Sequence, residues 1–372
     1  MTSIIYVGMD VHTTNYTLCC YSMEDDRFFA EVQVEPDAKN ILKYLARIEK
    51  QQSRDCRIVC GYEAGCLGYS LYHQLHAHGI DCVILAPTTM MTKPGKRIKT
   101  DRRDARLISK CLAFHTYSPV YIPTEVDDTV KEYIRMRDDA NSALARVKQQ
   151  IIAFCIRHGK IHDGKSYWTN KHLEWLSSLD LGNKILSEVL QEYLIRYSQL
   201  REQVDVYDMR INELAQAEPY RQKVEKLGCF RGIAAHTALS FCVEVGDFRR
   251  FATAQQFASY LGLVPGECSS GDKQQYTGIT KAGNSHLRKL LVETAQVFGR
   301  SATKSGKSVA LKERQAKCDS LTVAYADKAN ARLKKKYFKI AMRSKVNIAK
   351  TAVAREMACF IWGMMTDNIS CA

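Results

Sequence analysis

The sequence predicts an α/β domain at the N-terminus, long helices in the middle and a mostly helical C-terminal domain, divided at 1–123, 124–218 and 219–372. Three observations predict this arrangement. Strand and helix patterns alternate over the first 115 residues, apolar residues take a heptad spacing from 124 to 215, and helical patterns fill most of the rest. A chain of 372 residues exceeds what one hydrophobic core usually serves, so we expect more than one domain.

The N-terminal domain begins with three β-rich segments, after which strands and helices alternate. Early strands followed by βαβ units indicate a mixed sheet with helices packed on it. A further helix begins in the stretch KTDRRDA, at residues 99–105. We expect strands at 4–11, 16–22, 28–34, 56–63 and 81–87, and helices at 37–50 and 68–79.

The middle of the chain contains two apolar series that step by four and three residues. This heptad spacing predicts an antiparallel helical hairpin or an intermolecular coiled coil. A plain helical spacer and a dimerisation arm are both compatible with it. The first series is Ala140, Leu144, Val147, Ile151 and Phe154, and the second is Tyr193, Tyr197, Leu200, Val204, Tyr207, Ile211 and Leu214.

The C-terminal region begins with the pattern of a helix, a turn and a helix at 222–265. A loop is expected at 265–284, and further helices run to Thr366, before a tail that is expected to fray. The turn, CFRGIAAHTA, is a candidate helix-hairpin-helix, in which N–H groups at a helix start hold a phosphate.

Basic residues concentrate near the C-terminus. The net charge is +14, and residues 270–372 hold 20 Lys and Arg against 7 Asp and Glu. This asymmetry predicts a polyanionic partner such as a nucleic acid. One helical face carries a basic stripe interleaved with Tyr337 and Phe338, which we expect to bind phosphate backbone without reading sequence, although a solvated face is the alternative. The stripe consists of Arg332, Lys335, Lys336, Lys339 and Arg343.

Membrane insertion and disulfide bonding are not expected. No apolar run reaches the roughly 20 residues of a membrane span, and the N-terminus lacks a signal-peptide pattern, so we expect a cytoplasmic protein. The 14 cysteines are scattered, which favours small buried side chains. A zinc site at Cys56, Cys60 and Cys66 would lack a second ligand pair.

Four carboxylates stand where a mixed sheet usually places a site. Asp10 in GMDVH and Glu63 in GYEAG end strands, and Asp101 and Asp104 begin a helix. Two-metal phosphoryl transfer requires converging acids of this kind, and their oxygen ligands suit Mg²⁺. Taken singly, Asp10 could cap a turn, Glu63 could pair with a surface lysine, and Asp101 could be the N-cap of its helix. Together and in this order, they indicate an RNase H-like nuclease.

Two further sequence features bear on phosphoryl transfer: a pair of serines and a group of basic residues. The loop after Pro265 contains Ser269 and Ser270, but a serine needs a base or a metal to act as a nucleophile, and composition alone favours a Ser/Gly turn. Positive charges flank the helical acids, either as a phosphate track or as a solvated basic loop. These charges are Lys93, Lys96, Arg97, Lys99, Arg102, Arg103 and Arg106.

Six segments occur in one order along nearly the whole chain: GMDVH, GYEAG, KTDRRDARLISKCL, LGCFRGIAAHTAL with FATAQQFASYLGLVPGECSSG, GITKAGNSHLRKLL, and AKTAVAREMACFIWGM. In this order they resemble the insertion sequence 110 family of transposases, the DEDD transposases, and within it the 1111 subgroup. Piv-type DNA invertases are relatives. The segments are specific as a set, whereas none would be alone. CFRGI departs from the PGIG-like turn of many relatives, which weakens the helix-hairpin-helix interpretation.

The resemblance implies a RuvC-like (RNase H-fold) domain whose metal-binding acids match Asp10, Glu63, Asp101 and Asp104, with Mg²⁺, two ions per site, as cofactor. It implies a coiled-coil middle and a C-terminal serine that attacks DNA, which falls on Ser270, or on Ser269 if the loop alignment slips by one. The implied partners are DNA, a structured bridge RNA, and further copies of the chain in a dimer or tetramer in a prokaryotic cytosol or nucleoid. Expected nucleic-acid contacts are Lys96, Arg97, Lys99, Arg102, Arg103, Lys273, Lys281, Arg288 and the basic stripe.

The leading hypothesis is therefore an RNA-guided transposase that cuts and rejoins DNA. One alternative is a RuvC-like structure-specific endonuclease in which water attacks and Ser270 is a turn residue. Another is a nucleic-acid-binding protein without catalysis. Covalent DNA–protein adducts separate the first two, and Mg²⁺-dependent cleavage excludes the third.

Overall fold

The protein divides into two compact units, Met1–Ile122 and Pro123–Ala372. Each is described by itself below. The computed structural model describes residues 3–51, 56–65, 67–90, 100–267, 275–300 and 306–369.

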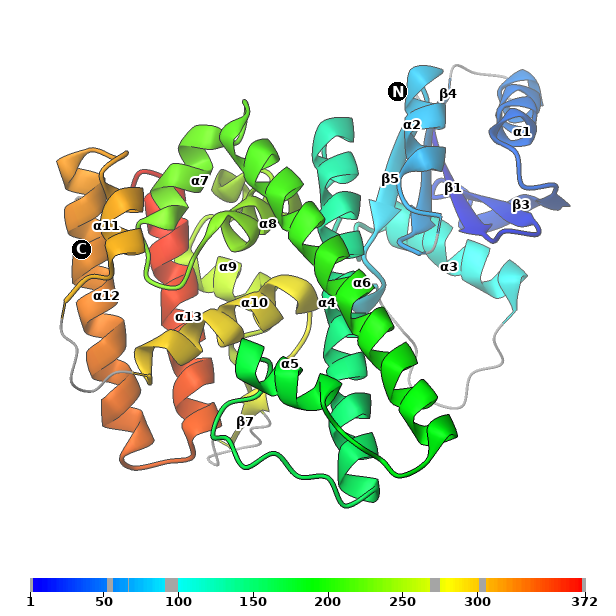
Figure 1. The fold of residues 1–372 in the computed structure, drawn as a ribbon. Coiled ribbons are helices and arrows are strands. Elements are labelled where there is room, and N and C mark those ends of the chain that lie inside the picture. The colour runs from blue at the N-terminus through cyan, green and yellow to red at the C-terminus, as the bar shows by residue number, and fades with distance from the viewer. Residues whose placement is uncertain are drawn as a thin grey trace. The chain divides into compact units, whose positions relative to one another are not determined.

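The first unit is built on a five-stranded mixed sheet with the strand order β3-β2-β1-β4-β5 (Figure 1). β2 pairs antiparallel with β1 and β3, whereas β4 runs parallel to both β1 and β5. The predicted mixed sheet is therefore confirmed. The strands are β1 (Ser3–Val11), β2 (Tyr16–Ser22), β3 (Arg27–Val34), β4 (Cys56–Glu63) and β5 (Asp81–Leu85).

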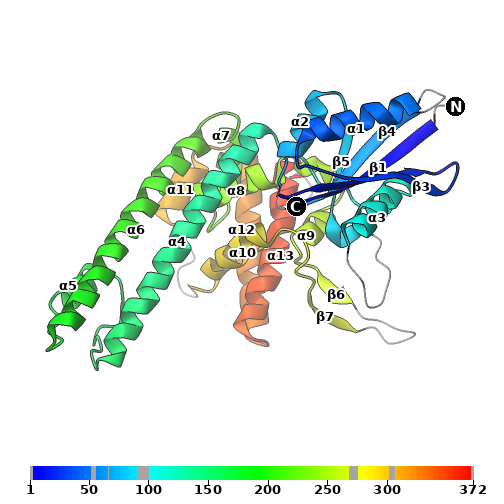
Figure 2. The same cartoon turned by 90° about the vertical axis from the view of Figure 1, so that its right-hand side faces the viewer.

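Helices cover both faces of the sheet: α1 (Ala38–Gln51), α2 (Ser70–Ala77) and α3 (Asp101–Ala113). Successive side chains of a strand point to opposite faces, so β1 contributes to two cores. Val7 packs in a cluster with Ile41 of α1, and Tyr6 packs in another with Ile108 of α3. Figure 2 shows α1 and α3 on opposite sides of the sheet.

The second unit begins with an antiparallel pair of long helices, α4 (Glu125–Arg157) and α6 (Lys184–Gln216), with the short α5 (Asn170–Ser177) between them. Contacts such as Tyr133 with Tyr207 and Phe154 with Tyr193 set the two helices in opposite directions (Figure 2). The predicted helical hairpin is confirmed. Its heptad residues pack against each other within one chain, in a cluster that includes Leu144, Val147, Ile151, Phe154, Tyr197 and Val204.

The rest of the second unit is a helical core whose centre is the apolar helix α13. Val353, Met357 and Ile361 are fully buried in it. Within the described ranges, no helix combines the length and the apolar character that a bilayer crossing requires. The helices are α7 (Arg221–Gly228), α8 (Ala235–Val245), α9 (Ala254–Tyr260), α10 (Ser285–Ala295), α11 (Val309–Gln315), α12 (Ser320–Ala341) and α13 (Val346–Met365).

The expectation of a loop throughout 265–284 is wrong. β6 (Pro265–Glu267) and β7 (Tyr276–Ile279) form a two-stranded antiparallel sheet in this segment. Strands of three and four residues are too short to leave a clear alternating pattern in the sequence.

Candidate active site

Two glycines let helix α3 lie directly against the sheet. A Cβ atom on Gly8 of β1 would stand 2.0 Å from the carbonyl oxygen of Ala105 and 2.4 Å from the amide nitrogen of Ser109. A Cβ atom on Gly61 of β4 would meet the side chain of Leu112 at 2.8 Å. Glycine is therefore needed for this close approach. The motifs GMD and GYE each place an acid two residues after the glycine, on the same face of the strand.

The two strand-end acids lie at one edge of the sheet. β1 and β4 are parallel, with Met9 opposite Tyr62, so Asp10 and Glu63 follow at adjacent positions. The side chain of Asp10 is only 15% exposed, whereas Glu63 is exposed to solvent. The sequence predicted that both acids stand at strand ends; the structure adds that the two strands are neighbours.

The first turn of α3 carries the other two acids. Thr100 is the N-cap of this helix, and its side-chain oxygen accepts a hydrogen bond from the N–H group of Arg103. The interpretation of Asp101 as the N-cap is therefore wrong, because Thr100 fills that position one residue earlier. Asp101 and Asp104 stand in the first turn, where the helix dipole favours negative charge.

A potential metal-binding group forms where the strand end meets the helix start. Ligand atoms of Asp10, His12 and Asp101 all lie within 4.8 Å of one another. The Oδ2 atom of Asp10 is buried and has no hydrogen-bond partner in the described part of the chain, and Nε2 of His12 is 3.3 Å from it. His12 was not among the residues predicted from the sequence. Its position two residues after Asp10, directly beyond the end of β1, is the signal that would have found it.

The electrostatics of this group favour a bound cation. Burial raises the pKa of the Asp10 carboxyl above its usual value, the charge of His12 opposes that shift, and the charges of Asp104 and Asp101 add to it. A cation at this point would relieve the repulsion among the carboxylates. A buried oxygen without a hydrogen-bond donor is an acceptor that a hard cation could satisfy.

The four predicted acids are brought together to different degrees. Asp10 and Asp101 share the close group, and Asp104 is near enough to raise the pKa of Asp10. Glu63 lies at the adjacent strand end, outside the close group, with its side chain exposed. Within the described residues, Asp10 and Asp101 are therefore the carboxylates best placed to bind a metal ion.

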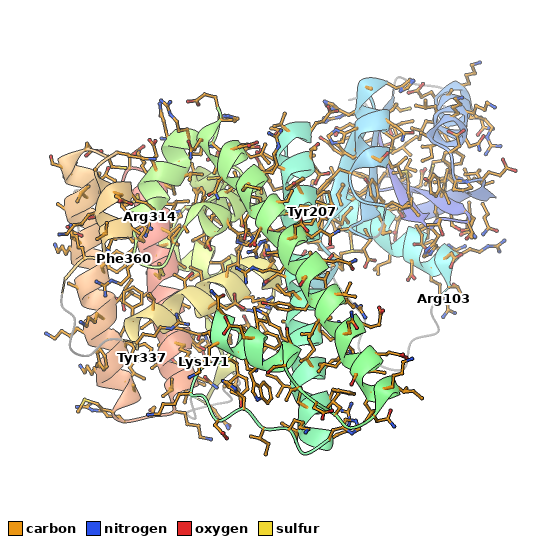
Figure 3. The ribbon with its side chains drawn as sticks, in the orientation of Figure 1. Arg103, Lys171, Tyr207, Arg314, Tyr337 and Phe360 are labelled. Carbon is orange, nitrogen blue, oxygen red and sulfur yellow. The ribbon has the colours of Figure 1, made fainter. Side chains whose placement is uncertain are left out.

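Basic residues on α3 contact an acid of β3. Arg106 donates to Glu31 at 2.6 Å, and Arg102 lies 3.3 Å from the same carboxylate with most of its side chain exposed. Figure 3 shows Arg103 at the beginning of α3. Lys93, Lys96, Arg97 and Lys99 lie outside the described residues.

The predicted serine falls between β6 and β7 in the sequence. Ser269, Ser270 and Lys273 fall outside the described residues. Lys281 follows β7 and is exposed, whereas Arg288 donates to the carbonyl oxygen of Leu261 at 2.9 Å and so supports the hairpin base.

The basic stripe of α12 is partly neutralised within the protein. Glu356 of α13 contacts Arg332 and lies 2.5 Å from the ammonium group of Lys336. Tyr337 does not interleave on the surface as expected, because it is only 6% exposed and packs in the helical core on α12 (Figure 3). Lys335, Lys339 and Arg343 are exposed, and Arg343 lies just beyond the end of the helix.

Among the described cysteines, Cys60 does not fit a zinc ligand. Burial raises the pKa of the Cys60 thiol well above its usual value, which disfavours the thiolate that zinc requires. Cys56 is half-buried, and Cys66 lies outside the described residues.

Comparison with known proteins identifies the family. Residues 225–314 match the Transposase IS116/IS110/IS902 family, and residues 7–156 match the DEDD transposase family of IS110 elements. The transposase for insertion sequence element IS1533 of Leptospira borgpetersenii is 32% identical over 340 residues, which are 90% of this chain and 95% of that protein. The protein y4qE of Sinorhizobium fredii, which also bears the name transposase, is 35% identical over 82% of this chain and 75% of its own length.

A third relative is more distant. The transposase for insertion sequence element IS1111A of Coxiella burnetii is 26% identical over 68% of this chain and 71% of its own length. The matches span both units of the fold, from the strand that carries Asp10 to the helices beyond the hairpin. The chain therefore belongs to the IS110-type family of insertion-sequence transposases, enzymes that cleave and rejoin DNA.

Proposed function

We propose that the acids at the β1–α3 junction hold Mg²⁺, two ions per site, in a RuvC-like nuclease domain. The observation that carries this proposal is that ligand atoms of Asp10, His12 and Asp101 lie within 4.8 Å of one another, with Nε2 of His12 3.3 Å from the buried Oδ2 of Asp10. Asp104, in the same helical turn as Asp101, and Glu63, at the end of the neighbouring strand β4, complete the proposed ligand set. When bound, Mg²⁺ would stabilise the negative charge that develops on a reacting phosphate.

The fold supports this assignment. Three antiparallel strands followed by two parallel ones, with α3 against the face that carries the acids, is the arrangement expected of a RuvC-like domain. The oxygen ligands match the preference of Mg²⁺, and the half-exposed imidazole of His12 is placed to contact either the cation or a substrate phosphate.

The nucleophile in this proposal is Ser270, with Ser269 as the alternative. Its hydroxyl oxygen attacks the scissile phosphorus, a serine–phosphate ester forms, and the bond to the leaving strand's oxygen breaks as that oxygen takes up a proton. Rejoining follows when a strand hydroxyl attacks the phosphorus of the phosphoserine: the new strand ester forms, the bond between the serine oxygen and phosphorus breaks, and the proton given up by the strand hydroxyl is replaced by one taken up on the serine oxygen. The acids and the serine belong to different units of the chain, and we propose that they meet in a dimer or tetramer.

Nucleic acids supply the specificity in this proposal. A structured bridge RNA pairs with donor and target DNA, and the protein holds the backbones of both. The exposed Lys335, Lys339 and Arg343 support such a role, together with the excess of basic residues in the last quarter of the chain.

The second candidate is a nuclease in which water attacks. It is favoured by the acid cluster, which by itself could serve metal-assisted hydrolysis without a serine. The two candidates differ in one product, because only serine attack leaves DNA covalently attached to the protein.

The test is adduct formation. Purified protein is incubated with Mg²⁺, the element's ends and its flanking RNA, and the products are separated on a denaturing gel. We expect an adduct that is lost in Asp10→Ala and in Ser270→Ala but kept in Ser142→Ala, a control on the exposed surface of α4. Cleavage that survives Ser270→Ala and Ser269→Ala without any adduct would favour the water-attacking nuclease.

A further inference from the structure

A groove with a volume of about 580 Å³ lies between α12 and α13, which run side by side in the second unit (Figure 1). Volumes of about 300–1,000 Å³ are usual for ligand sites. A glycine makes room for the groove's inner wall, because a Cβ atom on Gly363 of α13 would stand 2.4 Å from the hydroxyl of Tyr325 on α12. Cations and aromatic rings from the two helices line the space.

Three cations and one carboxylate line the groove, which gives it two net positive charges. Glu356 of α13 contacts Arg332 and Lys336 of α12. Burial opposes the charge of Glu356, but Lys336 and Arg332 outweigh it and keep the pKa of this carboxyl below its usual value. The side chains of Arg332 and Lys336 are still 71% and 36% exposed, and the third cation, Arg355, is exposed as well.

Glu356 therefore holds two cations at the groove without using all their hydrogen-bond donors. A guanidinium group has five N–H donors and an ammonium group has three. The remaining donors are free to bind the oxygens of a phosphate, which arginine and lysine bind through charge-assisted hydrogen bonds. The charged side of the groove thus fits an anion with several acceptor oxygens.

Two aromatic rings of α13 stand beside these cations. The guanidinium carbon of Arg332 lies 5.9 Å from the ring centroid of Phe360, and the Phe360 ring meets Tyr325 edge-on at 5.8 Å. The Tyr325 hydroxyl donates to the carbonyl oxygen of Phe360 at 3.2 Å, and Nε1 of Trp362 donates to the carbonyl oxygen of Phe251 at 3.1 Å. Phe360 and Trp362 are half-buried, so the core holds part of each ring and the groove exposes the rest.

Aromatic rings next to cations are the components of a site for an unpaired nucleotide. A free base can stack on an aromatic ring while its phosphate binds arginine or lysine. In a duplex, neighbouring base pairs cover the faces of each base, so a duplex would contact the cations but not the rings. The combination in this groove therefore favours a single strand.

We infer that the α12–α13 groove binds a single-stranded segment of nucleic acid, with a base against the rings of α13 and a phosphate on the cations of both helices. The inference rests on the proposed role of this basic region in holding nucleic acid and deepens it, because it names an unpaired strand as the partner. An unpaired base beside a phosphodiester occurs in RNA and in DNA, and the experiment separates these two sources.

The test compares single strands with a duplex. The full-length protein is titrated with single-stranded RNA, single-stranded DNA and a DNA duplex of equal length, and dissociation constants are measured by fluorescence anisotropy. Phe360→Leu removes one ring and keeps an apolar side chain. Its matched control is Phe114→Leu, because Phe114 is a 52% exposed phenylalanine of the first unit. Tryptophan emission is recorded in the same titrations, with Trp362→Phe and, on α5, the control Trp175→Phe.

For Phe360→Leu we expect roughly tenfold weaker binding of at least one kind of single strand, because a base loses its stacking partner, and unchanged binding of the duplex. Whether RNA, DNA or both are affected identifies the source of the strand. In the wild type, that strand and not the duplex should quench tryptophan emission. The quenching should disappear in Trp362→Phe and persist in Trp175→Phe, and Phe114→Leu should bind as the wild type does.

The phosphate contact has its own variant. Arg355→Gln should weaken single-strand binding and make its salt dependence shallower, by about 0.7 in the slope of the logarithm of affinity against that of salt concentration. Arg196→Gln, which removes an exposed arginine of α6, should change neither quantity.

Three results would overturn the inference: unchanged single-strand binding in a folded Phe360→Leu, an equal loss for the duplex, or quenching that does not depend on Trp362. If circular dichroism shows that Phe360→Leu is unfolded, the quenching decides, because it is measured on the intact wild type. Failure of the wild type to bind any of the three nucleic acids would instead overturn the proposed nucleic-acid role of the region, and the inference with it.

Discussion

Replacing Gly8 with alanine should separate α3 from the sheet and dismantle the acid cluster. The new Cβ atom would stand 2.0 Å from the carbonyl oxygen of Ala105, where ordinary contact begins at 3.4 Å, so the helix backbone would have to withdraw by roughly 1.4 Å. Backbone groups on both sides cannot rotate away as a flexible side chain can. Overpacking of this kind costs about 1–3 kcal/mol and sometimes more, and we expect the upper end of that range.

Two measurements would detect the expected loss of stability and of metal binding in Gly8→Ala. A cost of about 3 kcal/mol should lower the midpoint of thermal unfolding of the first unit by roughly 10 °C. Withdrawal of α3 would also move Asp101 away from Asp10, so the stabilisation that Mg²⁺ gives the wild type should be reduced or lost. The control is Gly65→Ala, whose Cβ would meet only the carbonyl oxygen of Glu63 at 3.8 Å, an ordinary contact. If Gly8→Ala unfolds at the wild-type temperature and keeps the full Mg²⁺ response, the account of how α3 is held is wrong.

Two other predictions concern the second unit. Although burial opposes the charge of His286, hydrogen bonds to Asp138 and Glu244 raise its pKa to about 9 in the fold, against about 6.5 in the unfolded chain. Its charge should therefore contribute about 3 kcal/mol that is fully present below pH 6.5 and is lost as the pH rises through 9. Unfolding measured from pH 6 to 10 checks this, and an equal pH dependence in His286→Gln would contradict it. Glu356→Gln should release Arg332 and Lys336 and raise the affinity for nucleic acid by roughly threefold to tenfold in a gel-shift assay at low salt. Unchanged or weaker binding would show that this part of the stripe does not contact nucleic acid.

Much of the first unit could be predicted from local pattern. β-rich segments between helical patterns located all five strands, and the parallel pairing of β1 with β4 brings Asp10 and Glu63 to one edge of the sheet. The position of α3 could not be predicted in the same way. It depends on the absence of a side chain at Gly8, whose effect is visible only when the helix is placed against the strand.

In the second unit, too, local sequence patterns predicted helices but not the contacts between distant residues. The heptad series predicted two long helices, because that pattern is local and repeated, but it left open whether they pair within one chain or between chains. The structure shows α4 packed against α6 in the same chain. The contact between Asp138 and His286 joins residues 148 positions apart, and no spacing in the sequence connects them. Hydrophobic periodicity cannot predict a buried network of charged side chains, because it detects apolar faces and assigns isolated polar residues to the solvent-exposed side.

The most direct test of the metal site is Mg²⁺ binding itself, measured by calorimetric titration of the purified chain and repeated with Mn²⁺ by electron paramagnetic resonance. The comparison is between the wild type, Asp10→Asn, and Asp25→Asn, a surface control whose partner is Arg27. We expect binding in the wild type and in Asp25→Asn, and at least a tenfold loss of affinity in Asp10→Asn, since the buried Oδ2 of Asp10 is at the centre of the proposed ligand set. Equal affinity in Asp10→Asn and the wild type would contradict it and would place the metal elsewhere.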